Sequence, residues 1–188
     1  MLQVPVAFVT SNPGKAREAA ALLGRPVTAQ EFDIPEIQSL DFEAVVRAKA
    51  LEAARRLGEP ALVEDSGLAI AAWGGFPGPL TRWITGEALG PEGLARMLAA
   101  FGDRRAEAVS ALGLARPGDR PADVLVAVGR VPGSIAEVPR GTNGFGWDAV
   151  FVPDGENRTW AEMDDAEKNR DSHRARSFRE MARILSRP

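Results

Sequence analysis

A lysine directly after a helix-start pattern is the first sign of phosphate chemistry. The stretch Thr10-Ser-Asn-Pro-Gly-Lys15 joins an apolar run to a helical one. Asn12 is a good N-cap and Pro13 suits the first helical position, so a helix should begin here. Lys15 conflicts with that pattern, because a cation in the first turn opposes the helix dipole. A bound phosphate would remove the conflict, since backbone N–H groups and the ammonium would point at the same anion.

Two adjacent carboxylates are candidates for holding a metal ion. Glu64 and Asp65 stand inside the apolar stretch 60–73, where we expect a break between two buried segments. Buried acids are costly unless a cation pairs with them, and Mg²⁺ or Mn²⁺ suits hard oxygen ligands. The alternative is a turn acid beside a salt-bridged acid. Glu36, in the loop 33–40, is a further candidate ligand or else an exposed loop acid.

The segment "GTNGFGWDAVF" combines glycines, two aromatic residues and an acid. Gly144 and Gly146 let the backbone approach a ligand closely. Phe145 and Trp147 could offer a stacking face for a base, and Asp148 could accept a hydrogen bond from a base N–H. The alternative is a glycine-rich turn whose aromatic side chains pack in the core.

Lysine and histidine are rare enough to be informative. Of the 23 basic residues 20 are Arg, so each lysine is a candidate for a site that needs a compact ammonium. The three lysines are Lys15, Lys49 and Lys168. His173, the only histidine, precedes Arg174 at the expected start of the last helix, with Ser172 as its N-cap. The alternative for that segment is a capped, basic surface helix.

Alternating helices and strands must position these residues. We expect helices over 14–23, 41–57 and 90–101, and polar helical segments within 159–185 that break near 169–172. In the helix 41–57 the apolar residues fall on one stripe, which contains Phe42, Val45, Val46, Ala50 and Ala53/Ala54. We expect strands over 2–10, 27–32, 104–115, 123–131 and 149–152, and on both sides of the acids in 60–73. The interleaving predicts an α/β fold, and the adjacent strands at 104–131 make its sheet mixed.

The composition favours one intracellular domain. A chain of 188 residues suits a single domain, 1–188, with two lobes. The absence of cysteine excludes disulfides and thiolate sites and fits a reducing cytoplasm. The formal charge of −3 argues against a general nucleic-acid binder. The longest apolar run has six residues, too few for a membrane span, and we expect no signal peptide.

Together these parts describe a nucleoside triphosphate site, and the chain resembles the inosine triphosphate pyrophosphatase family nearly end to end. The motifs that carry the resemblance occur in the family's order: "TSNPGK", "PEIQ", "VEDSGL", "GGFPGP", "FGWD", "AEKN" and "SHR". The three lysines and the only histidine all fall on motif positions. The resemblance implies a long mixed sheet with flanking helices that form two lobes around a central cleft, and a homodimer.

The resemblance also implies an activity and its residues. The activity is Mg²⁺-dependent hydrolysis of noncanonical purine nucleoside triphosphates (ITP, dITP and XTP) to the monophosphate and pyrophosphate. Asp65, Lys15 and Lys49 would be catalytic, with Asp65 the proton acceptor for the attacking water. Glu36 and Asp65 would bind the metal. The residues expected to bind substrate are Thr10, Ser11, Asn12, Pro13, Gly14, Lys15, Lys49, Ser66, Arg82, Phe145, Gly146, Trp147, Asp148, Lys168, His173 and Arg174.

One departure from the family and two other functions stay open. Many bacterial relatives carry an acid-rich stretch where Ala44-Val45-Val46 stands here, so a carboxylate role in that helix falls to Glu43 or is absent. One other function is a septum-inhibition-type pyrophosphatase for pyrimidine or modified nucleotides, against which "FGWD" and "SHR" argue. The other is a non-catalytic nucleotide-binding regulator, against which Asp65, Lys15 and Lys49 argue.

Overall fold

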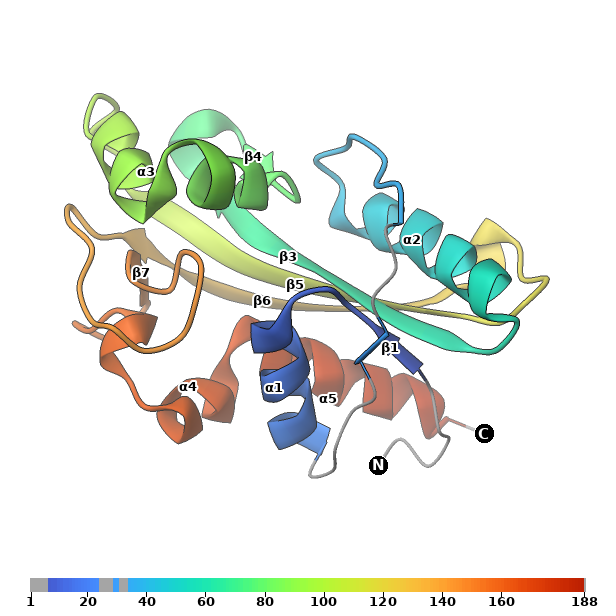
Figure 1. Ribbon diagram of the computed structural model, residues 1–188. Helices are drawn as coiled ribbons and strands as arrows, with labels where there is room; N and C mark the ends of the chain where they lie inside the picture. Colours follow the sequence, from blue (N-terminus) through green and yellow to red (C-terminus); the bar gives the residue numbers. More distant parts are fainter. Residues whose placement is uncertain (1–6, 24–28, 31–33, 188) are drawn as a thin grey trace.

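Helices cover both faces of one long, twisted sheet (Figure 1). The computed structural model describes residues 7–23, 29–30 and 34–187. Its helices are α1 (Pro13–Leu23), α2 (Phe42–Leu57), α3 (Gly90–Leu98), α4 (Asp165–Asp171) and α5 (His173–Leu185). Its strands are β1 (Ala7–Val9), β2 (Ala29–Gln30), β3 (Ala61–Ile70), β4 (Pro77–Gly78), β5 (Arg105–Ala115), β6 (Leu125–Ile135) and β7 (Phe151–Pro153). Short helical turns are η1 (Ala71–Trp73), η2 (Trp83–Ala88), η3 (Pro121–Asp123) and η4 (Trp160–Glu162).

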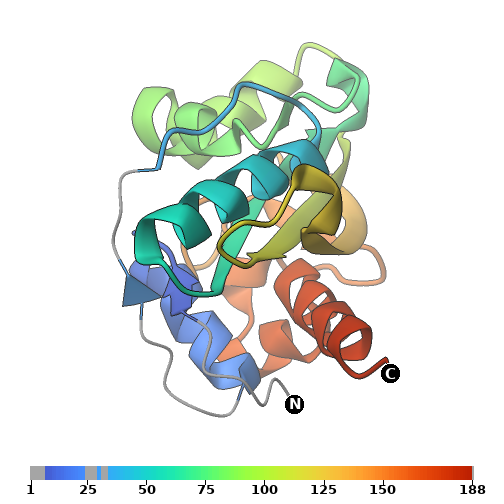
Figure 2. The ribbon, with the colours of Figure 1, turned by 90° about the vertical axis from the view of Figure 1, so that its right-hand side faces the viewer.

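The sheet is mixed, as predicted. Its described strands follow the order β2-β1-β3-β5-β6-β7, and β4 pairs with β3 beside this path. β1 lies parallel to β2 and β3, whereas the β3–β5, β5–β6 and β6–β7 pairs are antiparallel. Helices α2 and α3 lie on one face and α1, α4 and α5 on the other, which a perpendicular view also shows for α1, α2 and α5 (Figures 1 and 2). The expected α/β class is therefore confirmed.

α2 has the predicted apolar stripe and defined ends. Asp41 caps its start by accepting from the Glu43 N–H at 2.9 Å, and Gly58 ends it in the left-handed conformation at φ 71°. Its buried residues are the six that the helical spacing predicted: Phe42, Val45, Val46, Ala50, Ala53 and Ala54. They pack against side chains of β3 and β5, so α2 forms one wall of the sheet's upper face.

The predicted break in 60–73 does not occur. β3 runs without interruption from Ala61 to Ile70 and pairs with β5 along its whole length. Glu64 and Asp65 therefore lie in mid-strand, opposite Leu112 and Ala111. Successive side chains of a strand point to opposite faces, so the two acids face different layers of helices. The strand tolerates them because each face supplies cationic neighbours, which sequence periodicity cannot reveal.

Other boundaries differ modestly from prediction. β6 extends four residues beyond the expected 123–131, because its pairing with β5 continues through Arg105–Ser134. The expected strands at 2–10 and 27–32 are seen as Ala7–Val9 and Ala29–Gln30. Thr10 follows the end of β1, and the other residues of the two expected ranges lie outside the described part. The predicted break near 169–172 is confirmed at Ser172, between α4 and α5.

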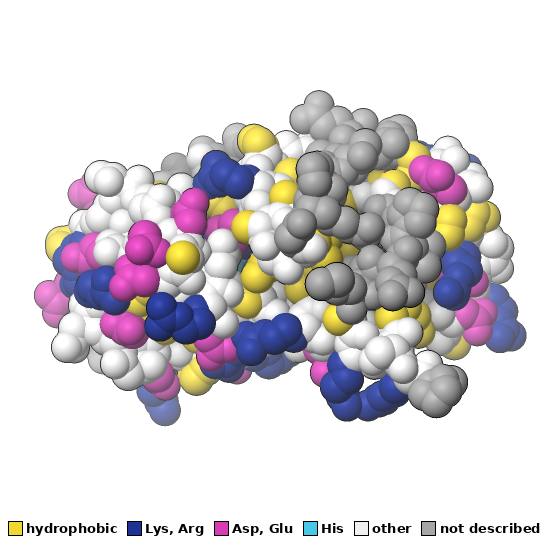
Figure 3. All heavy atoms as spheres, turned by 90° about the horizontal axis from the view of Figure 1, so that it is seen from below, with side chains coloured by type: hydrophobic (Ala, Val, Ile, Leu, Met, Phe, Trp, Pro, Cys, Tyr) yellow, Lys and Arg dark blue, Asp and Glu magenta, His cyan; other side chains and the backbone are white. Residues whose placement is uncertain are grey.

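The surface carries mixed charge on the face seen from below (Figure 3). Basic and acidic side chains alternate there over the described residues. Exposed ion pairs also occur along the last helix: Arg183 pairs with Glu180 within α5 at 2.6 Å, and Arg176 of α5 pairs with Asp171 of α4 at 2.6 Å. Within the described ranges, no helix has both the length and the apolar character needed to cross a bilayer.

Candidate active site

The expected phosphate loop is a capped helix start. The Asn12 Oδ1 atom accepts from the backbone N–H groups of Gly14 at 2.9 Å and Lys15 at 3.2 Å, so the predicted N-cap is confirmed. Thr10 Oγ1 accepts from the Asn12 N–H at 3.1 Å and orders the turn before it. A Cβ on Gly14 would meet the Phe145 ring at 2.6 Å, so glycine is required where the glycine-rich loop crosses this turn. The two expected ligand-binding loops are thus in contact.

Lys15 is half-buried and reaches toward β3. Its Nζ atom donates to the backbone oxygen of Glu64 at 3.5 Å. Burial lowers the pKa of the Lys15 ammonium, and the negative charges of Glu64 and Asp65 only partly offset that effect. The lysine therefore brings positive charge from the start of α1 to the middle of β3, where it lies near both acids.

Asp65 is a buried acid with charged neighbours, and one of its two carboxylate oxygens accepts no hydrogen bond from the described residues. Its side chain is buried, and Oδ2 has no hydrogen-bond partner among the described residues. Burial raises the pKa of Asp65 to about 6, although Lys15 and Lys49 act in the opposite direction. Burying a carboxylate oxygen without a hydrogen bond destabilises the folded state unless a ligand binds to that oxygen. The arrangement therefore leaves Asp65 available to a cation or to a proton.

Glu36 and Lys49 form an ion pair close to Asp65. Burial opposes ionisation of Glu36, but the Lys49 ammonium outweighs it and holds the pKa of Glu36 below its usual range. Glu36 also adds to the negative potential at Asp65. The loop carrying Glu36 and the helix carrying Lys49 thus bring one more carboxylate and one more ammonium to the Asp65 face of β3.

These carboxylates fit a magnesium ion bound jointly with substrate. The described part of the chain contains no group of three or more His, Cys, Asp or Glu side chains suited to a metal. Glu36 and Asp65 supply two carboxylates, and Asp65 Oδ2 is a hard oxygen to which no described residue donates a hydrogen bond. Mg²⁺ commonly takes one or two protein carboxylates and completes its shell with phosphate oxygens and water. The donor set is therefore adequate for Mg²⁺.

Five charged side chains form a buried ion network on the other face of β3. The Lys168 Nζ atom donates to Glu18 at 2.8 Å and to Asp148 at 2.6 Å. The Arg174 Nε atom donates to both carboxylate oxygens of Glu64, at 2.9 and 3.0 Å, and its Nη1 pairs with Glu18. All five side chains are at most 5% exposed. α1, β3, the glycine-rich loop, α4 and α5 are thereby joined in one cluster.

The buried ion network decides the role of Glu64. Burial opposes its ionisation, but Arg174 and Lys15 lower the pKa of the Glu64 carboxyl. Ser110 Oγ also donates to Glu64 at 2.8 Å and lies 2.9 Å from Ser177 Oγ. Glu64 is thus the salt-bridged acid of the alternative given in the sequence analysis. The expectation that Glu64 and Asp65 both bind one metal ion is therefore wrong for Glu64. The turn acid of that alternative is also absent, because Asp65 lies in mid-strand.

Arg174 is more constrained than the sequence suggested. Its Nε and Nη1 atoms contact Glu64 and Glu18, and Nη2 lies 3.5 Å from Ser66 Oγ. Each guanidinium nitrogen therefore already has a protein partner. Direct donation from Arg174 to a purine base stays a prediction, and it requires one of these contacts to be exchanged.

The two aromatic residues of the glycine-rich loop have different positions. The Phe145 ring is half-buried, with Lys168 Nζ 5.1 Å and Arg174 Cζ 5.6 Å from its centroid. Trp147 is 8% exposed and packs edge-on against Phe151 at 5.7 Å. Trp147 is therefore a core residue, and the expected stacking face on it is not available in this structure. Phe145 keeps that prediction.

Asp148 and the glycines shape the same loop. Asp148 Oδ2 accepts from the Phe145 N–H at 2.8 Å as well as from Lys168. Burial raises the pKa of Asp148, with Lys168 opposing the shift. Gly144 has φ 75°, and a Cβ there would lie 2.2 Å from Asp148 Oδ2. Gly144 is thus required for the turn, while Gly146 is exposed and open on its Cα side.

His173 lies inside an aromatic cluster, not on a surface helix. Ser172 Oγ accepts from the Ala175 N–H at 3.2 Å, which confirms the predicted cap. The His173 side chain is buried, and neither ring nitrogen has a hydrogen-bond partner among the residues described. Burial, with the charges of Arg174 and Lys168, holds the pKa of His173 well below its usual range. The imidazole is therefore neutral.

The remaining predicted residues lie nearer the surface. Ser11 and Arg82 are exposed, and Arg82 Cζ lies 5.7 Å from the ring of Trp83. Arg82 also contributes positive charge at Glu36, so it belongs to the Asp65 side of the sheet. Ser66 follows Asp65 in β3 and reaches Arg174 on the opposite face. The structure thus connects all the predicted segments through β3.

Two functional candidates escaped the sequence analysis. Glu18 accepts from both Lys168 and Arg174, and Ser110 orients Glu64. Glu18 had a signal, because it lies four residues after Gly14 on the same face of α1. Ser110 had none, since a serine within an apolar strand shows nothing of its partner.

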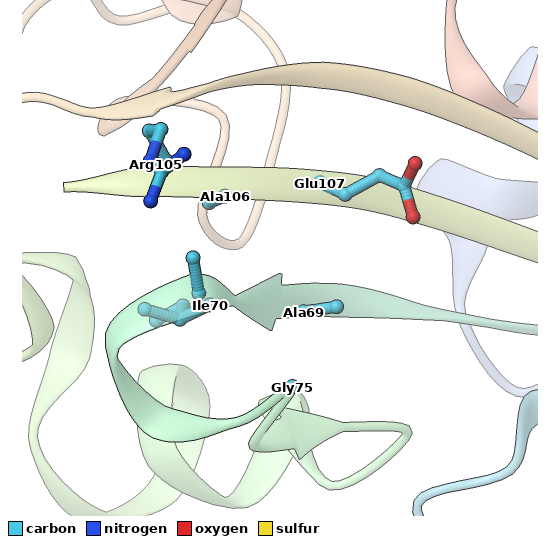
Figure 4. Close-up of a pocket in the computed structure, with 7 residues that line it drawn as sticks. Ala69, Ile70, Gly75, Arg105, Ala106 and Glu107 are labelled. Carbon is cyan, nitrogen blue, oxygen red and sulfur yellow. The ribbon is translucent and has the colours of Figure 1, made fainter. Parts of the chain in front are cut away.

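A cavity of about 330 Å³ elsewhere has no evident role (Figure 4). It lies at the ends of β3 and β5, next to Ala69, Ile70 and Ala106. Its charged residues are engaged already, Arg105 with Asp103 and Glu107 with Arg130. It contains none of the predicted site residues.

The comparisons with known proteins agree with this geometry. The sequence profile of the Ham1 family matches residues 6–184. The chain belongs to the Ham1 family. Ham1-family membership confirms the resemblance stated from the motifs.

Named relatives cover almost the whole chain. The dITP/XTP pyrophosphatase of Methanopyrus kandleri is 41% identical over 180 residues, 94% of each protein. Inosine triphosphate pyrophosphatase 2 of Trypanosoma cruzi is 46% identical over 176 residues, which cover 92% of this chain and 88% of that protein. A HAM1 protein from Coxiella burnetii has a TM-score of 0.81 at 32% identity, with 96% of this chain and 98% of the other covered. The Ham1 fold is therefore shared from end to end.

Proposed function

We propose that this Ham1-family protein hydrolyses ITP, dITP and XTP to the monophosphate and pyrophosphate. The observation that carries the proposal is the approach of the Lys15 and Lys49 charges to Asp65 in mid-β3, whose Oδ2 has no hydrogen-bond partner among the described residues. The relatives named as dITP/XTP and inosine triphosphate pyrophosphatases support it. Such a reaction would remove these nucleotides from the cellular pool.

The charged residues divide the work at the triphosphate. Mg²⁺, or Mn²⁺ in its place, supplies charge neutralisation and orientation of the phosphates when bound by Glu36 and Asp65. Lys15 and Lys49 hold the phosphate oxygens, because the Gly14 and Lys15 N–H groups at the start of α1 already donate to Asn12. Asp65 accepts the proton of the attacking water, for which its raised pKa makes it a better base than an ordinary carboxylate. In-line attack then separates the α- and β-phosphates.

The opposite face of β3 would hold the base and ribose. Phe145 offers a partly exposed ring, and His173 brings two ring nitrogens that have no hydrogen-bond partner within the described ranges. Lys168, Asp148 and Arg174 add donors and acceptors, and Gly146 leaves the loop open. A site that hydrogen-bonds a 6-oxo group and N1–H would leave its groups unpaired against adenine. This supports selection of oxopurines.

The test is release of pyrophosphate from ITP with Mg²⁺. Equal amounts of IMP and pyrophosphate are the expected products, and IDP with orthophosphate would contradict the proposal. A panel of ITP, dITP, XTP, ATP and modified pyrimidine triphosphates separates it from the septum-inhibition-type alternative. Tight nucleotide binding without turnover would identify a regulator instead.

We also propose a homodimer in the cytoplasm. Large apolar side chains are exposed at Trp83 (56%), Phe101 (55%) and Val138 (60%), which supports an association surface. The lack of cysteine supports a reducing compartment. Light scattering on the purified protein tests the first part, and a monomeric mass would contradict it.

A further inference from the structure

The indole of Trp160 contacts two residues of the proposed base side. Trp160 begins the turn η4 and is 2% exposed. Its ring is stacked on the His173 imidazole, with centroids 4.9 Å apart and an interplanar angle of 16°. The Lys168 ammonium lies 5.5 Å from the same ring. One buried side chain therefore touches both residues, although it belongs to none of the motifs.

No described residue makes a hydrogen bond that could orient the His173 ring. A functional histidine is usually fixed by a hydrogen bond to one of its nitrogens. Here both nitrogens lack a partner in the described part of the protein, so packing alone sets the plane of the imidazole. Trp147 adds only a tilted contact, at 5.3 Å and 48°. The parallel Trp160 ring is thus the main restraint on that plane.

Trp160 is itself firmly held. Its turn is capped by Thr159, whose hydroxyl donates to the Arg140 backbone oxygen at 2.8 Å. The Ala161 N–H donates to the Asp148 backbone oxygen at 3.2 Å, which ties the turn to the glycine-rich loop. Phe151 packs 4.5 Å from the Trp160 ring centroid. Because the core holds the indole in place, the indole in turn restrains the position of the side chains packed against it, His173 and Lys168.

We propose that Trp160 is a positioning residue that fixes the His173 imidazole, beside the Lys168 ammonium that Glu18 and Asp148 already hold, for contact with the purine base. The inference rests on the proposed function, because it assigns these two residues to base binding. Trp160 itself touches no substrate atom. Its replacement should therefore weaken base recognition while leaving the triphosphate contacts on the Asp65 face intact.

The first test uses the only histidine as a spectroscopic probe. In the free protein, the His173 ring protons should resonate upfield because the stacked indole shields them. Trp160→Leu should remove most of that shift, and Trp160→Phe should keep part of it, since an aromatic ring remains. Trp73→Leu, a tryptophan change in a different aromatic cluster, is the matched control and should leave the signal unchanged. An unchanged His173 signal in Trp160→Leu would overturn the inference.

The second test separates base from phosphate recognition. Trp160→Leu should lower kcat/KM for ITP about 10- to 100-fold, mainly through KM, as a misplaced contact group can do. The inhibition constant of inorganic tripolyphosphate should stay the same. Trp160→Phe should keep about a third or more of wild-type kcat/KM, because the stack persists. Equal damage in Trp160→Phe and Trp160→Leu, or weaker tripolyphosphate binding, would assign Trp160 a purely structural role.

The two proposals can fail separately. If the wild-type protein does not release pyrophosphate from ITP, the proposed function is wrong, and the His173 signal still reports whether Trp160 holds the ring. If ITP is hydrolysed and Trp160→Leu lowers ITP and ATP turnover equally, the function stands and the positioning role is wrong.

Discussion

Glu64 and Asp65 are neighbours in β3, yet their carboxylates lie on opposite faces of the sheet and in opposite electrostatic states. Glu64 is bonded to Arg174 and Ser110, and its pKa is lowered. Asp65 keeps an oxygen without a partner among the described residues, and its pKa is raised to about 6. On the Glu64 face, protein side chains satisfy the carboxylate. On the Asp65 face, a ligand could still bind the carboxylate oxygen that has no partner among the described residues. In the proposed function, base selection and phosphate chemistry are divided between the faces of this strand.

The largest effect should come from Asp65→Asn. Loss of the proton acceptor lowers turnover by roughly 10²–10⁴-fold, and loss of a metal ligand adds to it. The melting temperature should stay equal or rise, because a pKa raised from 3.8 to about 6 makes ionised Asp65 a destabilising group above that range. Pyrophosphate release and thermal unfolding measure the two effects.

Asp154→Asn is the matched control, since Asp154 is exposed. It should change neither turnover nor melting temperature. Retention of more than about a tenth of wild-type turnover in Asp65→Asn would contradict the catalytic assignment.

On the Glu64 face, a substitution in the buried ion network should lower the stability of the fold. Arg174→Met leaves Glu64 and Glu18 as buried charges without their partner, which typically costs about 3–5 kcal/mol. For a chain of this length that lowers the melting temperature by roughly 6–20 °C. We also expect kcat/KM to fall more steeply for ITP than for ATP, because the base side is disturbed.

The Arg174 experiment also distinguishes two roles. An unchanged melting temperature with loss of ITP turnover would make Arg174 a base contact that the buried ion network does not need. An equal fall for ITP and ATP would assign Arg174 to phosphate binding or structure. A Glu64→Gln/Arg174→Met double variant should lose less stability than the sum of the single changes, because the two side chains are in contact.

Lysine-to-arginine changes should have an intermediate effect on the Asp65 face. Lys15→Arg and Lys49→Arg keep the charge but introduce a wider, forked group into a crowded site. We expect kcat/KM to fall by about tenfold or more, as misplaced phosphate contacts can cause. Arg96→Lys, at an exposed position of α3, is the control. Near-normal kcat/KM in both lysine variants would contradict the inference that the few lysines mark sites that need a compact ammonium.

The smallest effect is a shift of the acid limb of the pH profile. Asp65 must be ionised to accept a proton or bind a metal, so kcat/KM should fall as pH drops through about 6. Because Mg²⁺ competes with the proton for the same carboxylate, raising its concentration should move the limb to lower pH. A limb that does not move with Mg²⁺ would separate Asp65 from the metal.

Local patterns predicted the parts of the site, and distant contacts decided how the parts act. The caps Asn12 and Ser172 and the stripe on α2 follow from spacing of a few residues, and all were confirmed. Glu18 meets Lys168 across 150 positions of the chain, so no window of sequence contains both. Trp147 shows the same limit, because a tryptophan beside glycines has the same local pattern in a core as in a binding face.

The break expected at Glu64 and Asp65 was wrong for a related reason. The sequence shows two charges in an apolar run, which argues against a buried strand. It does not show that Arg174 and Lys15 come from other elements to compensate them. The family resemblance supplied the residue roles, but not the division of the two acids between faces.

The length of β3, β5 and β6 has a mechanical consequence. These strands span the molecule from α2 to α3 (Figure 1), and their registers join ten residue pairs in each interface. Sliding one end of the sheet past the other would have to shear all of those pairs at once. The three strands therefore form a rigid unit, and twisting of the sheet is the deformation that leaves their pairing intact. We therefore expect an arriving nucleotide to displace the segments attached to these strands, such as residues 34–41 before α2 and the glycine-rich loop before β7.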